Sequence, residues 1–436
     1  MSKPLCILQA PLLTRSGYGD WSMAVAKSLL RYDKFDLKVV PTRWGATPSR
    51  HAIEEMNDDM EKELFSRILR SPLTKQPELF IQITIPNEFQ AMAKYNIGMT
   101  AGIETTVPPG PWLEGLNRMD INVAISSFCK EVLTKASFVK KAQNGMEEEL
   151  KNTKPMEVVC WGANTDVYKK TDATIDSVES VMNDIKEDWC FAFVGQWTHG
   201  GTYNDRKDIG NLIKTFLKTF KNEKNKPALV LKTSGVSFSK IDKNDILGKI
   251  HEIKNEVGGN DLPNVYLLHG DLSDEEMNAF YNHSKIKAFV NFTHGEGYGH
   301  PLLLASLSGK PILVSNWSGH LDFLNKDYTN LLNGEVLPVD GSSVNDWIIK
   351  ESAWFYVNYE QASKKMKGLL DNDVYAKLLD KAEKLRVENM EKFSMQAMDK
   401  NFHTFLDKYV PEFPQEQKIV LPKLKKIELP KLTKVG

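Results

Sequence analysis

Short apolar runs alternate with amphipathic segments along nearly the whole chain. Runs typical of buried strands occur at residues 5–9, 36–41, 79–83, 121–125 and 158–160 in the first part, and at 191–195, 228–233, 264–268, 288–292 and 312–315 in the second. Most of the segments between them repeat their apolar residues at helical spacing. This alternation predicts an α/β fold, in which helices cover both faces of parallel sheets.

A polar stretch at 168–188 divides the chain into two such series, and 436 residues are too many for one ordinary hydrophobic core. We therefore expect two Rossmann-like, doubly wound domains that face each other across a cleft. Their predicted bounds are 1–170 and 171–392, with a mostly helical part from 344 to 392, a closing helix within 393–415 that returns to the first domain, and a lysine-rich tail at 416–436.

Composition and charge narrow the class of protein only a little. Hydrophobic residues make up 41% and charged residues 26%, and the formal net charge of −1 gives no overall attraction to nucleic acid or anionic membranes. The four cysteines stand far apart without a CxxC pair, so neither a zinc site nor a disulfide framework is indicated. We expect no membrane span and no signal peptide, because no apolar run is long enough, and a cytoplasmic α/β enzyme is the expected class.

Three loops at the carboxyl ends of predicted strands have the features of a ligand site. Residues 14–20 and 294–300 each place glycines between a strand and a helix, and residues 195–208 follow another strand. In doubly wound domains, ligands bind at these strand ends. The glycines of 294–300 allow the backbone to turn and approach a ligand closely, and the helix that follows offers free N–H groups, which suit a phosphate.

A group of basic residues accompanies these loops. Arg206 and Lys207 follow the strand at 191–195, and Lys232 lies at the end of the apolar strand at 228–233. If the strands are neighbours, these cations converge with the helix start near 300 and form a diphosphate site. Surface cations are common in a chain with 56 lysines and arginines, but a lysine at the end of an apolar strand is harder to explain in that way.

Other polar groups admit more than one interpretation. Glu296 stands in the glycine loop between His294 and His300, and three such side chains could suggest a metal site. No third ligand of usual spacing accompanies His294 and Glu296, so we expect no bound metal. Glu104 ends a predicted strand and either faces the cleft or caps a helix. Asp371-Asn-Asp373 fits a metal-binding DxD pattern literally, although a helix cap or turn is the better interpretation.

The patterns of several enzyme classes are missing from the sequence. No G-x-G-x-x-G follows a predicted strand, which disfavours a dinucleotide-dependent dehydrogenase. Neither a Walker A pattern nor a G-x-S-x-G elbow occurs, which disfavours P-loop nucleotide hydrolases and α/β hydrolases.

The stretch that begins at Glu296 resembles a signature of glycosyltransferase family 4, whose members are retaining enzymes with the GT-B fold. The signature reads E-G-[FY]-G-x-P-x-x-E-A-x-x-x-G-x-P-[VI], and this chain reads E-G-Y-G-H-P-L-L-L-A-S-L-S-G-K-P-I. Parts at 16–19, 161–168, 194–197, 206–207, 231–233, 269–277 and 392–398 also resemble the family, in the same order. The resemblance covers roughly residues 5–408.

The resemblance implies a glycosyltransferase that uses a nucleoside diphosphate sugar, with a UDP-sugar as the expected donor, retention of configuration, and no required metal or other cofactor. It places the acceptor side in the first domain and the donor in the second. The implied catalytic residues are Glu296, which holds the transferred sugar, and Arg206, Lys207 and Lys232, which neutralise the diphosphate. The implied donor-binding residues are Gly195, Gly270, Leu272, Gly297, Tyr298, Gly299 and His300, and those on the acceptor side are Gly17, Tyr18, Gly19 and Glu104.

The chain departs from the signature at one position. The family has a second glutamate eight residues after the first, which contacts the ribose of the nucleotide, and this position falls on Leu304. Leucine cannot accept a hydrogen bond from a ribose hydroxyl, so the resemblance implies that the ribose is held in another way. An inactive binding protein that keeps the cleft is the alternative, although the four implied catalytic residues all remain.

The acceptor hypothesis comes from a further likeness. Residues 315–324 resemble family members carried by large tailed phages, some of which glycosylate hydroxymethylated cytosine in their own DNA. This makes 5-hydroxymethylcytosine in phage DNA the preferred acceptor, with the host cytoplasm as the expected location. The lysines of 416–436 suit phosphate contacts, although a tail without such a role is the simpler interpretation. A glycan acceptor is the alternative, and the sequence fixes neither the sugar nor the oligomeric state.

Overall fold

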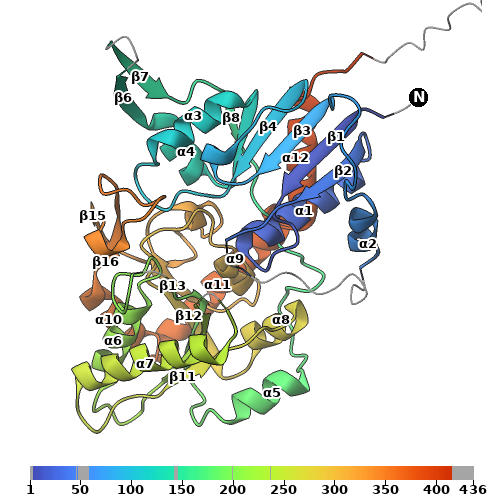
Figure 1. Ribbon diagram of the computed structural model, residues 1–436. Coiled ribbons are helices and arrows are strands. Elements are labelled where there is room, and N and C mark those ends of the chain that lie inside the picture. The colour runs from blue at the N-terminus through green and yellow to red at the C-terminus, as the bar shows by residue number, and fades with distance from the viewer. Residues whose placement is uncertain are drawn as a thin grey trace, which may run out of the picture.

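Two six-stranded parallel sheets lie at the centres of two units, one above the other (Figure 1). The computed structural model describes residues 3–45, 47, 58–141, 146–198, 200–235 and 237–414, so the predicted tail at 416–436 lies outside the described residues. Neighbouring strands within both sheets are parallel, and their orders are those of doubly wound α/β folds. The predicted α/β class with two Rossmann-like sheets is confirmed.

The first sheet has the strand order β2-β1-β3-β4-β5-β8. Its strands are β2 (Asp36–Pro41), β1 (Leu5–Ala10), β3 (Leu79–Ile83), β4 (Tyr95–Thr100), β5 (Ile121–Ala124) and β8 (Met156–Val158). Its helices are α1 (Gly17–Tyr32), α2 (Asp59–Ser66), η2 (Pro86–Glu88), α3 (Gly110–Arg118) and α4 (Ser127–Lys135). Every residue of β3 and β5 is buried, as central strands covered on both faces require.

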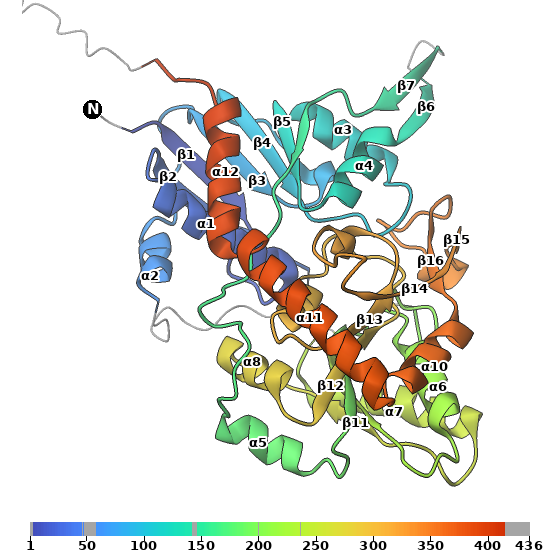
Figure 2. The ribbon, with the colours of Figure 1, turned by 180° about the vertical axis from the view of Figure 1, so that it is seen from behind.

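A hairpin that the hydrophobic pattern does not predict projects from the first unit. β6 (Ser137–Lys141) and β7 (Glu147–Lys151) pair in the antiparallel sense and extend away from the sheet in both views (Figure 1 and Figure 2). Lysines of β6 lie opposite glutamates of β7, as in the pair of Lys140 and Glu148. The periodic signal of a strand is weak here because both strands are mostly exposed and β7 is mostly charged.

The second sheet has the order β11-β10-β9-β12-β13-β14. Its strands are β11 (Val265–Leu268), β10 (Ala228–Ser234), β9 (Cys190–Gln196), β12 (Ile286–Asn291), β13 (Ile312–Ser315) and β14 (Asn330–Leu332). Its helices are α5 (Asp176–Asn183), α6 (Ile209–Phe220), α7 (Lys240–Val257), α8 (Asp274–Asn282), α9 (His300–Ser306), η3 (Gly319–Asp322), η4 (Gly341–Ser343), α10 (Tyr359–Gly368) and α11 (Asn372–Lys392). None of the helices in the described parts of the chain is long and apolar enough to cross a membrane.

The prediction of mostly helical structure from 344 onward is wrong at its start. β15 (Gly334–Pro338) and β16 (Ala353–Val357) form an antiparallel pair at the side of the second unit. Trp354 of β16 is fully buried in a small apolar cluster with Val339 and Ile348. On the other face of β16, Phe355 and Val357 join the main core of the second unit. The run forms a strand because both of its faces pack, which the run alone does not reveal.

The last two helices carry the chain from the second unit back to the first (Figure 2). α11 packs against α9, and α12 (Met395–Tyr409) packs against α1, where Arg31 Nε lies 2.6 Å from an oxygen of Asp399. Between these helices, the Ala163 N–H donates to the Phe393 carbonyl and the Met395 N–H donates to the Ala163 carbonyl, both at 2.8 Å. The two passages of the chain between the units therefore lie side by side.

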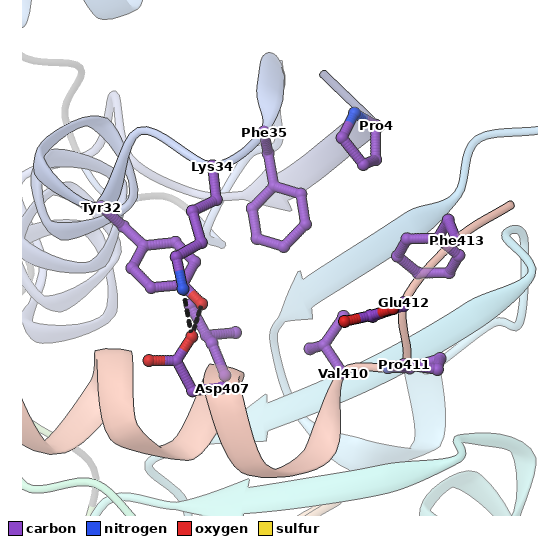
Figure 3. Close-up of a pocket in the computed structure, with 10 residues that line it drawn as sticks. Pro4, Tyr32, Lys34, Phe35, Asp407, Val410, Pro411, Glu412 and Phe413 are labelled. Carbon is purple, nitrogen blue, oxygen red and sulfur yellow. Dashed lines mark hydrogen bonds and ion pairs between the residues drawn. The ribbon is translucent and has the colours of Figure 1, made fainter. Parts of the chain in front are cut away.

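The end of α12 is fixed to the edge of the first unit (Figure 3). Asp407 accepts hydrogen bonds from the Tyr32 hydroxyl and from Lys34 Nζ, both at 2.5 Å. A cavity of about 430 Å³ lies beside them, lined by Pro4, Tyr32, Lys34, Phe35, Leu406, Asp407, Val410, Pro411, Glu412 and Phe413. None of the residues predicted to bind a ligand lines this cavity.

Candidate active site

The strand order of the second sheet brings the predicted cations and carboxylate to one edge. β10, β9 and β12 are neighbours, and their carboxyl ends carry Lys232, the pair of Arg206 and Lys207, and Glu296. Gly195 lies near the end of β9, where a Cβ atom would lie 3.7 Å from Lys207 Cε. That distance is an ordinary contact, and the closer neighbour of the Cβ position is the Phe193 ring, at 3.0 Å.

Glu296 is the buried centre of this cluster, with 4% of its surface exposed. Its carboxylate accepts hydrogen bonds from Lys207 Nζ at 2.5 Å and from Arg206 Nη1 at 3.2 Å. Burial would raise the pKa of Glu296, but the charges of Lys207 and Arg206 outweigh it and lower the pKa to about 2. The glutamate is therefore ionised at neutral pH and can accept hydrogen bonds from hydroxyl groups. Burial lowers the pKa of Lys207, and its ion pair with Glu296 opposes that change.

Two buried aspartates, which the sequence pattern did not single out, hold the loop of Arg206 and Lys207 in place. Asp205 accepts hydrogen bonds from two backbone N–H groups of the loop, at 3.0 and 3.1 Å. Asp208 has a left-handed backbone with φ of 53° and accepts from the Tyr359 hydroxyl at 2.7 Å. Burial raises the pKa of both aspartates to about 7. A signal was available, because aspartates before an amphipathic helix often serve as caps.

Glu104 approaches the cluster from the first unit. It follows β4, and its Oε1 lies 3.8 Å from Arg206 Nε. Arg206 therefore stands between two carboxylates, one from each unit. Nearby, the Thr106 N–H donates to the Ala353 carbonyl and the Ala353 N–H donates to the Thr106 hydroxyl, both at 2.9 Å. The structure places the Glu104 carboxylate beside a cation of the second unit.

The glycine loop between β12 and α9 packs against the first unit. A Cβ atom on Gly295 would lie 2.0 Å from the Glu104 carbonyl oxygen, and one on Gly297 would lie 2.0 Å from the Ala101 carbonyl oxygen. The Gly297 carbonyl also accepts a hydrogen bond from Ser126 Oγ at 2.6 Å. These glycines allow close approach of two backbones, whereas the sequence predicted close approach to a ligand.

The other predicted residues of this loop make contacts within the protein. Gly299 has φ of 87° and precedes α9. Tyr298 is buried and donates its hydroxyl to the Trp161 carbonyl at 2.7 Å, and the His300 ring stacks on the Trp161 ring with centroids 3.4 Å apart. Burial lowers the pKa of His300 to about 3, so its ring is neutral. Because α9 has only seven residues, the dipole at its N-terminus is weak compared with the charges of the nearby side-chain cations.

His294 is tied to the β15–β16 hairpin. Its Nδ1 bonds with the Phe355 carbonyl at 2.7 Å, and its ring stacks on Trp354 with centroids 4.6 Å apart. Burial lowers its pKa to about 4. Within the described residues, no group of three or more histidine, cysteine, aspartate or glutamate side chains is placed to hold a metal. Asp371 caps α11 by accepting from two N–H groups at 3.0 Å, which confirms the interpretation of the DxD pattern as a cap.

The glycine loop of the first unit supports the backbone that faces Gly297. The Tyr18 hydroxyl accepts from the Ala101 N–H at 2.9 Å and bonds with Thr100 Oγ1 at 3.0 Å. A Cβ atom on Gly19 would lie 2.2 Å from a carbonyl oxygen of its own loop, whereas Gly17 has open space around it. Both of these hydrogen bonds of the Tyr18 hydroxyl are made within the first unit.

Lys232 lies beside the loop that follows β11. Its Nζ donates to the Gly270 carbonyl at 2.7 Å and lies 5.6 Å from the ring centre of Phe238. No atom lies within 4 Å of a Cβ position on Gly270, so this backbone is open. Leu272 is partly buried against the core, and so is Leu304, which holds the position of the missing glutamate.

No protein-family model matches this sequence, and no curated protein is significantly similar to it. Solved structures do match. Sucrose-phosphate synthase from Thermosynechococcus elongatus has a TM-score of 0.59 at 11% identity, over 93% of this chain and 98% of that one. A glycosyltransferase from Rickettsia africae has a TM-score of 0.56 at 13% identity, over 93% and 99%. The Anabaena protein HepE in complex with UDP-glucose has a TM-score of 0.57 at 11% identity, over 93% and 99%.

This chain has the GT-B fold. At these identities the likeness concerns the arrangement of the two units and not their chemistry. The GT-B arrangement places the cluster around Glu296 between the two units, with Glu104 on the opposite side.

Proposed function

We propose that this protein is a glycosyltransferase that moves a sugar from a nucleoside diphosphate sugar, with a UDP-sugar as the donor, to an acceptor hydroxyl. The observation that carries the proposal is the convergence of Glu296 with Arg206 and Lys207 in the cleft, beside Lys232 on the adjacent strand. With Arg15 and Asp271 included, four cations face three carboxylates here, and the excess positive charge suits a diphosphate. The structure of HepE with UDP-glucose, which shares the fold, supports the same donor class.

The chemistry follows from this arrangement of charges. The bond between the anomeric carbon and the diphosphate oxygen breaks, and Arg206, Lys207 and Lys232 stabilise the negative charge that develops on the leaving group. Glu296 accepts hydrogen bonds from the sugar hydroxyls and orients the sugar. The acceptor oxygen forms the new bond on the same face, as the resemblance to retaining enzymes implies, and its proton passes to the departing phosphate oxygen. If the product is inverted instead, Glu104 is the candidate base.

We propose 5-hydroxymethylcytosine in DNA as the acceptor. The basis is the resemblance of residues 315–324 to family members carried by large tailed phages. A glycan is the second candidate because the insertion that carries β15 and β16 contacts Thr106, close to Glu104. The exposed charged residues of this insertion are Glu335, Asp340, Asp346 and Glu351, against Lys350. Such an acidic surface repels a phosphate backbone and suits sugar hydroxyls.

Turnover by the purified protein tests the proposed donor. Labelled UDP-sugars, offered one at a time with acceptor, should release UDP, and Lys232→Ala and Glu296→Gln should each reduce the release by about 100-fold or more. Lys384→Ala, which removes an exposed cation from α11, is the matched control and should leave the rate unchanged. The proposal fails if both site variants fold and keep wild-type turnover.

The acceptor is tested in parallel with DNA that contains 5-hydroxymethylcytosine, with unmodified DNA and with oligosaccharides. Label on the modified DNA alone supports the DNA hypothesis, and label on an oligosaccharide alone replaces it with the glycan. Mass analysis of the product then gives the sugar, and its anomeric configuration decides between retention and inversion.

A further inference from the structure

The cleft edge of the second sheet presents its polar groups in a linear order. Glu296 lies after β12, Arg206 and Lys207 after β9, Lys232 near the end of β10, and Asp271 in the loop after β11. Neighbouring strands lie about 4.8 Å apart, so the edge from β12 to β11 spans roughly 14 Å. A carboxylate, a group of cations and a second carboxylate follow one another along this edge.

Asp271 is the exposed carboxylate at the far end of this row. Arg15, from the glycine loop of the first unit, donates through one nitrogen to both of its oxygens, at 2.6 and 2.5 Å. The two side chains keep 31% and 39% of their surface exposed, so they meet at the cleft surface and not in the core. A carboxylate has about four lone-pair sites, and Arg15 occupies two of them. The other sites are able to accept hydrogen bonds from a pair of neighbouring hydroxyl groups.

The nearby carboxylates are engaged in contacts that hold the fold. Asp242 bonds with His269 at 2.8 Å and accepts from the Gly235 N–H at 2.9 Å. Asp274 accepts from the Tyr168 hydroxyl at 2.9 Å, at the start of α8. Asp271 differs from both because its partner Arg15 lies on the glycine loop of the first unit.

An exposed aromatic ring lies beside the same loop. Phe238 is 41% exposed, and its ring centre lies 5.6 Å from Lys232 Nζ and 6.1 Å from the His269 ring. Lys232 connects the ring to the loop, because it also donates to the carbonyl of Gly270, the neighbour of Asp271. An exposed ring of this kind offers a face on which a nucleobase can stack.

We propose that Asp271 accepts the ribose hydroxyls of the donor and that Phe238 stacks on its base. The inference rests on the proposed function, and it provides the ribose-binding carboxylate that Leu304 does not supply. The donor then lies along the edge with its sugar at Glu296, its diphosphate at the cations and its nucleoside at the β11 loop. Arg15 acts as a positioning residue that holds the carboxylate from the first unit, so ribose recognition depends on the closed arrangement of the two units.

Binding of UDP and of 2′-deoxy-UDP, measured by calorimetry, tests the assignment of Asp271. The wild-type protein should bind UDP about tenfold more tightly than 2′-deoxy-UDP, and Asp271→Asn should lose most of that preference. Loss of the charge alters the attraction for phosphate equally for both nucleotides, so the ratio of the two Kd values is the readout. Asp380→Asn, which removes an exposed carboxylate from α11, is the matched control and should keep the ratio.

Two further variants separate the roles of the neighbours. Arg15→Gln should also reduce the ratio, and its combination with Asp271→Asn should reduce it no further, because the two side chains act as one unit. Phe238→Leu should weaken both nucleotides about tenfold without changing the ratio.

The outcomes keep this inference distinct from the proposed function. A wild-type protein that binds UDP without preferring it over 2′-deoxy-UDP, or an Asp271→Asn protein that retains the tenfold preference, overturns the inference and leaves the proposed function standing. A wild-type protein that binds neither nucleotide overturns both.

Discussion

Replacing Glu296 by glutamine tests whether this carboxylate and the donor diphosphate compete for the same cations. The substitution keeps the size of the side chain but removes the charge that faces Lys207 at 2.5 Å and Arg206 at 3.2 Å. Removing one partner of a buried ion pair costs about 3–5 kcal/mol. Arg206 keeps 27% of its side chain exposed and has Glu104 at 3.8 Å, so we expect a loss near the lower limit, about 3 kcal/mol, in the free energy of unfolding of the donor-free protein.

Binding of a nucleoside diphosphate should reverse part of that loss. In the Glu296→Gln protein, the cations receive the diphosphate without giving up a carboxylate. If about half of the penalty is recovered, UDP should bind roughly tenfold more tightly to the variant than to the wild-type protein. Sugar transfer should nevertheless fall by about 100-fold, because the sugar hydroxyls lose their charged acceptor.

Chemical denaturation with and without UDP, together with calorimetric titration, measures both effects. Glu360→Gln, which removes an exposed carboxylate paired with Lys364, is the control and should change neither quantity. A Glu296→Gln protein of wild-type stability, or one that binds UDP no more tightly than the wild-type protein, would show that Glu296 is not the counter-charge of these cations.

Three other predictions concern the scaffold of the site. Gly297→Ala puts a methyl group 2.0 Å from the Ala101 carbonyl oxygen and should abolish turnover, because the two units no longer pack together at this loop. Gly248→Ala in α7, with open space around it, should stay active, and equal rates would refute this. Burial raises the pKa of Asp208 from 3.8 to about 7, so the folded protein holds a proton that the unfolded chain loses, and the free energy of unfolding should fall by up to about 4 kcal/mol between pH 4 and 7. Asp208→Asn should reduce that slope in urea titrations at several pH values, with Asp205 still contributing a slope of the same sign, and an unchanged slope would contradict the shift. Phe402→Ala removes a fully buried ring from α12 and should cost about 3–5 kcal/mol in urea denaturation, against less than about 0.5 kcal/mol for the exposed Thr404→Ala; similar losses would argue against the packing described.

The hydrophobic pattern predicts the central strands well because these are buried on both faces. The runs at 79–83 and 312–315 coincide residue for residue with the buried strands β3 and β13. The run at 36–41 coincides with the edge strand β2, which is only partly buried. The two hairpins escape the pattern for opposite reasons. β6 and β7 are mostly exposed and therefore show no buried face in their pattern. β16 resembles any short apolar run, and its partner β15 is separated from it by a long loop.

The part of the candidate site that lies within the second unit was predictable from the sequence, whereas its contacts with the first unit were not. The rule that parallel strand ends share one edge brings Arg206, Lys207, Lys232 and Glu296 together before any coordinates are known. Contacts between the units follow no such rule. Arg15 and Asp271 are 256 positions apart in the sequence, and nothing in either local pattern indicates that one lies opposite the other.

The return of α12 to the first unit has a consequence for synthesis of the chain. The strands of the first unit leave the ribosome long before α12, the helix that covers α1. The last strand of the second unit, β16, has been synthesised by residue 357. Buried residues of α12, among them Met398, Phe402 and Phe405, complete the first unit at the very end. Domains generally fold in the order in which they are made. Here the half that is translated first is finished last, and its apolar surface stays uncovered while the other half is being built.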